Sequence, residues 1–232
     1  MVLIKGWQKT SLIDYSPFTA SVIFVGGCTF KCGYCHNPEL VMGYSDIPSI
    51  KQKEILDYLE KKKIWIDGVC ITGGEPTIYK ELPKFVSKIK QLGMKVKLDT
   101  NGTNPPIIEK LLRKKLVDYV AMDIKNVLDK YHHVAGVPVE TDKIQQSIDL
   151  IKNSGIDHEF RTTVIPSLVG KKEIFQIGKW LKGSKKFVIQ NFRATRPLID
   201  NSLRELQSYS KEDLEEMKDI ASEYFEEVEV RD

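Results

Sequence analysis

Short β-rich runs alternate with amphipathic segments along the whole chain. Apolar and β-branched residues form six such runs, and helical spacing separates them. The predicted strands are Ala20–Val25, Gly68–Thr72, Lys95–Asp99, Tyr119–Lys125, Glu159–Ile165 and Lys186–Phe192, with a further strand at Val228–Arg231. This repeated order predicts a parallel sheet with helices packed outside it. Periodicity alone leaves open whether the sheet closes into a barrel or stays open and doubly wound.

The segments between the strands carry helix signals. Within 82–92, apolar residues recur every three or four positions and stop before a glycine. Ser49 with Gln52 forms a capping-box pair ahead of the next apolar stripe, and Ser210 with Asp213 opens the last helix. These signals predict helices that cover the sheet.

Composition excludes several classes of protein. The 232 residues are 41% apolar and 29% charged, an ordinary balance for a globular protein with a sizeable core. A formal net charge of +3 is too small to indicate a nucleic-acid or membrane partner. No strictly apolar run exceeds four residues, and Met1–Pro17 lacks the apolar core of a signal peptide. We therefore expect a cytoplasmic protein.

Three of the four cysteines, Cys28, Cys32 and Cys35, fall within eight residues after the first predicted strand. Secreted proteins spread their cysteines to join distant loops, whereas clustered thiols in an intracellular chain indicate a metal site. Three thiolates are one short of a closed zinc or ferredoxin site. Zinc could take His36 or the strand residue Cys70 as fourth ligand. A 4Fe–4S cluster needs no fourth residue when one iron stays open for a substrate, and thiols without a metal are the third alternative.

Other unusual residues follow predicted strands, end them or, for Arg161, lie within one. They are the turn Gly73-Gly74-Glu75-Pro76, the stretch Asp99-Thr100-Asn101-Gly102, the pair Asp123 and Lys125, and the arginines Arg161 and Arg193. The carboxyl ends of parallel strands meet at one edge of the sheet, so we expect these side chains to lie there together. Ordinary turn chemistry also accounts for the first two stretches, and strand alternation accounts for Asp123 and Lys125.

The spacing Cys-x3-Cys-x2-Cys after a first strand, with Tyr34 before the third cysteine, resembles the radical S-adenosylmethionine (radical SAM) superfamily. The Gly-Gly-Glu-Pro turn at 73–76 supports the resemblance independently. Within the superfamily, the run Cys35-His36-Asn37-Pro38-Glu39-Leu40 and the leader at 6–15 resemble the glycyl-radical-enzyme activases. The activating proteins of anaerobic ribonucleoside-triphosphate reductase are the most similar. The resemblance covers nearly the whole chain.

The resemblance implies an α/β fold, an incomplete (β/α)6 barrel of parallel strands that is open at one side. It implies one radical SAM domain over 1–232, with a cluster loop at 26–38 and a C-terminal helix and strand at 210–231. The three cysteines would hold a 4Fe–4S cluster, and S-adenosylmethionine would chelate its open iron. One electron from the reduced cluster would then cleave S-adenosylmethionine to methionine and a 5′-deoxyadenosyl radical.

The resemblance also implies which other residues contact the cofactor. Gly73 and Gly74 would let backbone atoms approach the methionine amino group, and the Glu75 carboxylate would bind that ammonium. Further cofactor-binding candidates are Tyr34 beside the cluster, Asp99, Thr100 and Asp123 as ligands of a monovalent cation, Lys125 for the methionine carboxylate, and Arg161 and Arg193 for the ribose or carboxylate.

An activase takes a hydrogen atom from a backbone glycine of a partner protein. We expect anaerobic ribonucleoside-triphosphate reductase as this partner and a flavodoxin or ferredoxin as reductant. The main alternative is a radical enzyme for a small molecule or nucleoside, similar to 7-carboxy-7-deazaguanine synthase. A non-catalytic iron–sulfur electron carrier is a third class, but it predicts four cluster ligands. Only Cys70 remains beyond the three clustered cysteines, too few for an auxiliary cluster.

Overall fold

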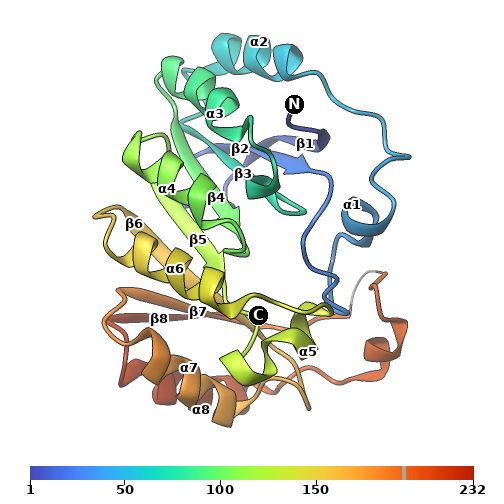
Figure 1. Ribbon diagram of the computed structural model, residues 1–232, viewed down its shortest axis with the longest axis vertical. Coiled ribbons are helices and arrows are strands. Elements are labelled where there is room, and N and C mark those ends of the chain that lie inside the picture. The colour runs from blue at the N-terminus through green and yellow to red at the C-terminus, as the bar shows by residue number, and fades with distance from the viewer. Residues whose placement is uncertain (195–196) are drawn as a thin grey trace. The chain divides into compact units, whose positions relative to one another are not determined.

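The computed structural model, drawn in Figure 1, describes residues 1–194 and 197–232. The contacts within the chain divide it into two compact units. The first unit comprises Met1–Thr29, Glu39–Ala121 and Asp142–Asp157. The second comprises Phe30–Pro38, Met122–Thr141 and His158–Asp232. The predicted cluster loop at 26–38 therefore begins in the first unit and continues in the second.

The first unit is built on β1 (Ile4–Ser11), β2 (Ala20–Val25), β3 (Gly68–Gly73) and β4 (Lys95–Thr100). β1 pairs with β2 in antiparallel orientation, and β2, β3 and β4 are parallel neighbours in chain order. β2 to β4 match the predicted strands to within one residue. No strand is predicted over β1, because most of its residues are polar or glycine and face at least partly to solvent. An edge strand of this kind lacks a clear apolar alternation.

The helices of the first unit contribute apolar side chains to its core. They are α1 (Pro38–Met42), α2 (Gln52–Lys62), the short 3-10 helix η1 (Pro76–Ile78), α3 (Leu82–Gln91), α4 (Pro105–Arg113) and α6 (Thr141–Lys152). α3 confirms its predicted stripe, since Leu82, Phe85 and Ile89 are buried. The capping box predicted from Ser49 and Gln52 is wrong. The N-cap of α2 is Lys51, which makes no side-chain cap.

The second unit carries β6 (Asp157–Val164), β7 (Lys186–Asn191) and β8 (Glu227–Arg231), which are parallel neighbours in chain order. β5 (Tyr119–Asp123) runs from the first unit into the second and is two residues shorter than predicted. The helical elements are η2 (Leu128–Lys130), α5 (Tyr131–Ala135), α7 (Lys171–Leu181), η3 (Asn201–Glu205) and α8 (Lys211–Ser222). The predicted start of α8 is confirmed, because the Ser210 side chain accepts a hydrogen bond from the Asp213 N–H.

The predicted α/β class with parallel strands is confirmed. β1 pairs with β2 and, at Ile4, with the single residue Ile50, and it stands at one end of the strand order. β8 stands at the other end and pairs with β7. Within residues 1–194 and 197–232, no helix has the length and apolar character that crossing a membrane requires.

Candidate cofactor site

The predicted cluster ligands lie on the loop that follows β2, which we call the cysteine loop (residues 26–38). All four cysteines of the chain are thiols rather than disulfides. Cys28 and Cys35 are half-buried, Cys32 is buried, and Cys70 lies wholly buried in β3. Among the described residues, no three or more His, Cys, Asp or Glu side chains lie close enough together to hold a metal ion.

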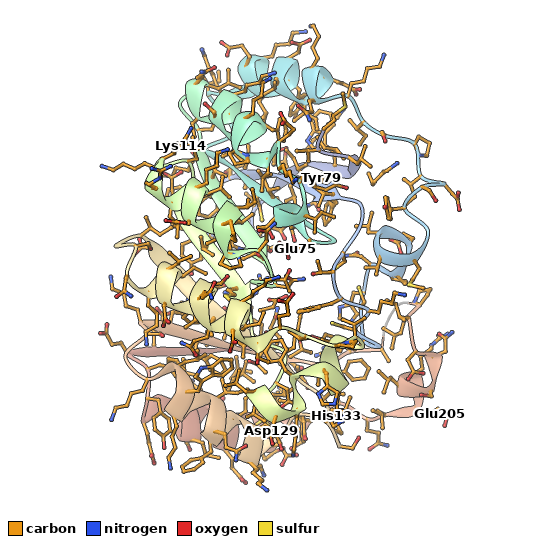
Figure 2. The ribbon with its side chains drawn as sticks, viewed as in Figure 1. Glu75, Tyr79, Lys114, Asp129, His133 and Glu205 are labelled. Atoms are coloured by element: carbon orange, nitrogen blue, oxygen red, sulfur yellow. The ribbon has the colours of Figure 1, made fainter. Side chains whose placement is uncertain are left out.

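The first part of the cysteine loop is fastened to the turn after β3. The Glu75 N–H donates to the Gly27 carbonyl at 2.8 Å, and the Tyr79 hydroxyl donates to the Gly26 carbonyl. Both side chains are labelled in Figure 2. The Gly27 N–H in turn donates to the Leu40 carbonyl at 2.7 Å. This part of the loop is therefore held by backbone bonds within the first unit.

The two glycines of the turn are required by close backbone packing. Gly73 has a φ of +116°, a conformation that favours glycine, and a Cβ there would lie 2.4 Å from the Val25 nitrogen. A Cβ on Gly74 would lie 1.9 Å from the Gly27 carbonyl oxygen. The glycines thus bring the turn after β3 against the start of the cysteine loop. Their predicted approach to the methionine amino group stays a prediction.

Glu75 is buried, 1% exposed, and its carboxylate binds the protein itself. Oε1 accepts hydrogen bonds from the Thr77 N–H, the Thr77 hydroxyl and the Thr100 hydroxyl, and Oε2 accepts one from the Asn101 N–H at 2.7 Å. Burial raises the pKa of Glu75, and these hydrogen bonds oppose that rise. The carboxylate joins the end of β4 to η1. The ammonium of S-adenosylmethionine, its expected partner, would have to bind a carboxylate whose two oxygens already accept four hydrogen bonds.

Asp99 and Thr100 also have partners inside the first unit. Asp99 Oδ1 lies 3.2 Å from Lys97 Nζ, and that ammonium donates to the Asp14 carbonyl at 2.7 Å. The Thr100 hydroxyl donates to Glu75 and accepts from the Gly102 N–H. A cation at these oxygens would have to compete with an ammonium and with a hydrogen-bonded turn.

Asn101 is a neighbour of the cysteine loop. The sequence placed the stretch 99–102 at this edge of the sheet but gave Asn101 no role of its own. Its Nδ2 donates to Cys28 Sγ at 3.7 Å and to Thr29 Oγ1 at 2.9 Å. The sequence assigned no contact to this side chain, because hydrogen bonds with residues over 70 positions away leave no local pattern. Its contact with Cys28 is therefore a feature of the site that only the structure identifies.

The second part of the cysteine loop is held within the second unit. The Lys31 N–H donates to the Ala135 carbonyl at 2.8 Å, and the Gly33 carbonyl accepts from the Asp200 N–H at 2.9 Å. His36 Nε2 lies 2.9 Å from the Arg193 carbonyl oxygen, which accepts its hydrogen bond. His36 thus anchors the loop to the chain after β7, a role that does not require it to bind zinc.

A buried ammonium lies beside Cys32 and Tyr34. Lys125 Nζ is 5.6 Å from the centre of the Tyr34 ring and 3.0 Å from Asp123 Oδ2. Burial raises the pKa of the Cys32 thiol and of the Tyr34 hydroxyl, while the charge of Lys125 opposes both shifts. Burial opposes the charge of Lys125 itself, but Asp123 and Tyr34 raise its pKa well above the usual value.

Asp123 lies between two cations. Arg161 Nε donates to Asp123 Oδ1 at 2.8 Å, whereas Lys125 Nζ contacts the other carboxylate oxygen, Oδ2. Burial alone would raise the pKa of Asp123, but Arg161 and Lys125 lower it to about 2. Arg161 is therefore bound to a carboxylate rather than open to a ribose. Arg193, half-exposed, pairs with Asp232 at 2.8 Å.

A family model described as the Radical SAM superfamily matches residues 22–174. The match begins in β2 and ends in α7, so it includes the whole cysteine loop and the turn with Glu75. The chain belongs to the radical SAM superfamily. Membership implies a 4Fe–4S cluster and S-adenosylmethionine as cofactors.

Relatives of similar length narrow the class of radical SAM enzyme. A Methanocaldococcus jannaschii protein with the name glycyl-radical enzyme activating enzyme is 33% identical over 99% of this chain and 95% of its own length. A pyruvate formate-lyase-activating enzyme from Clostridium pasteurianum is 26% identical over 96% of this chain and 98% of its own. This radical SAM enzyme therefore belongs among the glycyl-radical enzyme activating enzymes.

A solved structure of another radical SAM enzyme supports the fold alone. SuiB of Streptococcus suis, bound to its precursor peptide SuiA, aligns with a TM-score of 0.69 at 17% identity. The alignment covers 90% of this chain and 48% of SuiB, so the chain spans about half of that protein. The open partial barrel of the radical SAM fold agrees with the predicted fold class.

The donor set of the cysteine loop fits the implied cluster. Three thiols separated by three and two residues supply soft ligands, and the fourth cysteine is enclosed in β3. Lys125 supplies a positive charge beside Cys32, which favours the thiolate that iron requires. These residues match a cluster held by three cysteines.

Proposed function

We propose that this radical SAM activase acts on a backbone glycine of an anaerobic ribonucleoside-triphosphate reductase. The observation that carries the activase class is the 33% identity with a glycyl-radical enzyme activating enzyme along 99% of the chain. The leader at 6–15 and the run 35–40 resemble the glycyl-radical-enzyme activases, and the choice of reductase rests on the activating proteins of that enzyme being the most similar among them. Pyruvate formate-lyase, named by the relative from Clostridium pasteurianum, is the competing partner.

When bound, the reduced cluster and S-adenosylmethionine would supply a 5′-deoxyadenosyl radical as the acceptor of a hydrogen atom from the glycine. In this proposal Cys28, Cys32 and Cys35 bind the cluster. The Lys125 ammonium would bind the carboxylate of S-adenosylmethionine, and its ion pair with Asp123 would then be broken. This exchange is chemically reasonable because Arg161 keeps the charge of Asp123 balanced.

The proposal also includes a cytoplasmic location and a flavodoxin or ferredoxin as electron donor. It does not include a monovalent cation, because Asp99 and Asp123 each pair with a cationic side chain and the Thr100 hydroxyl donates to Glu75. The Glu75 carboxylate acts in this proposal by holding the turn after β3, not by binding the cofactor.

Electron paramagnetic resonance with candidate partners tests the proposal. The chain is reconstituted anaerobically with iron and sulfide, reduced chemically, and mixed with S-adenosylmethionine and either anaerobic ribonucleoside-triphosphate reductase or pyruvate formate-lyase. A doublet from a glycyl radical is expected on the reductase. A reductase variant with alanine in place of its radical glycine is the matched control and should give no doublet.

A doublet on pyruvate formate-lyase alone would keep the activase class but replace the proposed partner. Coupled formation of 5′-deoxyadenosine with a small molecule such as a purine, and with neither protein, would contradict activation as the function. The signal of the reduced cluster, recorded in the same samples, shows whether the enzyme was competent in each case.

A further inference from the structure

The side-chain amide of Asn101 has a defined orientation beside Cys28. The Thr103 N–H, which can only donate, bonds to Asn101 Oδ1 at 3.1 Å, and the Thr103 hydroxyl donates to the same oxygen at 2.8 Å. The amide oxygen is thereby assigned to the Thr103 side. The NH2 group then faces Thr29 Oγ1 and Cys28 Sγ, at 2.9 and 3.7 Å. Asn101 is 5% exposed, so little water competes for these bonds.

The backbone on both sides of this amide is fixed by buried partners. The Asn101 N–H donates to Glu75 Oε2 at 2.7 Å. The neighbouring Gly102 carbonyl accepts from the Ser147 hydroxyl of α6 at 2.7 Å. Asn104, three residues on, donates to the Thr77 carbonyl at 2.6 Å. A donor held in this way cannot turn away from Cys28 without breaking several bonds at once.

A hydrogen bond to a cysteine ligand changes the electronic balance of an iron–sulfur cluster. An N–H donor stabilises negative charge on the sulfur, and the reduced cluster carries one more negative charge than the oxidised form. We propose that Asn101 is a positioning residue that raises the reduction potential of the cluster through Cys28. The inference rests on Cys28 as a cluster ligand, as in the proposed function, but not on the identity of the partner.

Two substitutions separate the amide donor from its supporting bonds. Asn101→Ala removes the donor together with the bonds to Thr103 and Thr29. Asn101→Asp keeps an acceptor for Thr103, and the Thr29 hydroxyl can donate to the second carboxylate oxygen, but an anion replaces the N–H at the sulfur. Asn104→Ala is the matched control, because it removes an amide from the same loop that bonds to Thr77 and not to Cys28.

The measurement is a redox titration of the reconstituted cluster, followed by electron paramagnetic resonance without any partner protein. We expect Asn101→Ala to lower the reduction equilibrium constant about tenfold, which is about 59 mV for a one-electron couple. Asn101→Asp should lower it further, and Asn104→Ala should leave it unchanged. Iron and sulfide contents are determined for each variant.

An unchanged potential in both Asn101 variants would overturn the proposal, as would an equal shift in Asn104→Ala. Loss of the cluster from both Asn101 variants would also overturn it, because Asn101 would then act in folding rather than in tuning. Failure of the chain to activate any glycyl-radical protein would leave the measured potentials intact, so the two proposals fail separately.

Discussion

Gly74 lies closer to the backbone of the cysteine loop than any side chain allows. A Cβ at this position would be 1.9 Å from the Gly27 carbonyl oxygen and 2.6 Å from its carbon. Ordinary contacts of a Cβ begin at 3.4 Å, so Gly74→Ala must separate two backbone segments by about 1.5 Å. The Glu75 N–H bond to the same Gly27 oxygen would be lost with that movement.

The expected cost follows from these contacts. Overpacking of this kind costs about 1–3 kcal/mol, and the lost hydrogen bond costs about 1 kcal/mol. The substitution also restricts the unfolded chain, which returns about 0.4–1 kcal/mol. We expect the free energy of unfolding to fall by about 2 kcal/mol. With a urea dependence of about 2 kcal/mol per M, the midpoint would fall by about 1 M.

Urea unfolding of the apo chain, followed by tryptophan fluorescence, measures this change. Gly43→Ala is the matched control in the same unit, because the nearest atom to its added Cβ is the Glu39 carbonyl oxygen at 3.9 Å. Its midpoint should rise by about 0.2–0.5 M above that of the parent, since this substitution adds no clash and only restricts the unfolded chain. Equal midpoints for Gly74→Ala and Gly43→Ala would refute the reasoning from backbone contact.

Three further predictions concern the site. Changing any one of the three cysteines of the cysteine loop to Ser should abolish iron binding after reconstitution, while Cys70→Ser should retain it. Iron analysis of the four variants tests this prediction, and loss of iron in Cys70→Ser would mean that Cys70 is a fourth ligand. Glu75→Gln should lower the free energy of unfolding by about 1–3 kcal/mol, because an amide cannot accept all four hydrogen bonds; the exposed Glu81→Gln is the control in urea unfolding. Asp123→Asn should make stability less dependent on pH in acid. The folded-state pKa of Asp123 is lowered to about 2, so its contribution, on the order of 2 kcal/mol, is present above pH 4 and lost as the pH falls toward 2. A parent-to-variant difference that stays constant from pH 5 to pH 2 would contradict this assignment.

Several strands and helices follow from the sequence because their signals are local. The apolar runs that become β2, β3 and β4 are buried on neighbouring strands, and their alternation with helical stripes is enough to predict parallel pairing. The Ser210 cap also needs only its neighbours in the chain. β1 escapes prediction because an edge strand with polar residues has no apolar pattern of its own.

The sequence by itself also predicts the chemistry of the cysteine loop, since its three thiols lie within eight residues of one another. What only the tertiary structure decides is which side chains act on that loop. The sequence predicts that Glu75 contacts the cofactor, but in the structure its buried carboxylate accepts hydrogen bonds from the protein. The side chain of Asn101, which stands in an Asn-Gly pair typical of turns, donates to Cys28. Lys125, predicted to bind the methionine carboxylate, forms an ion pair with Asp123 in the structure. Hydrogen bonds between residues 25 to 73 positions apart depend on how the strands pack, and no local pattern of residues encodes such packing.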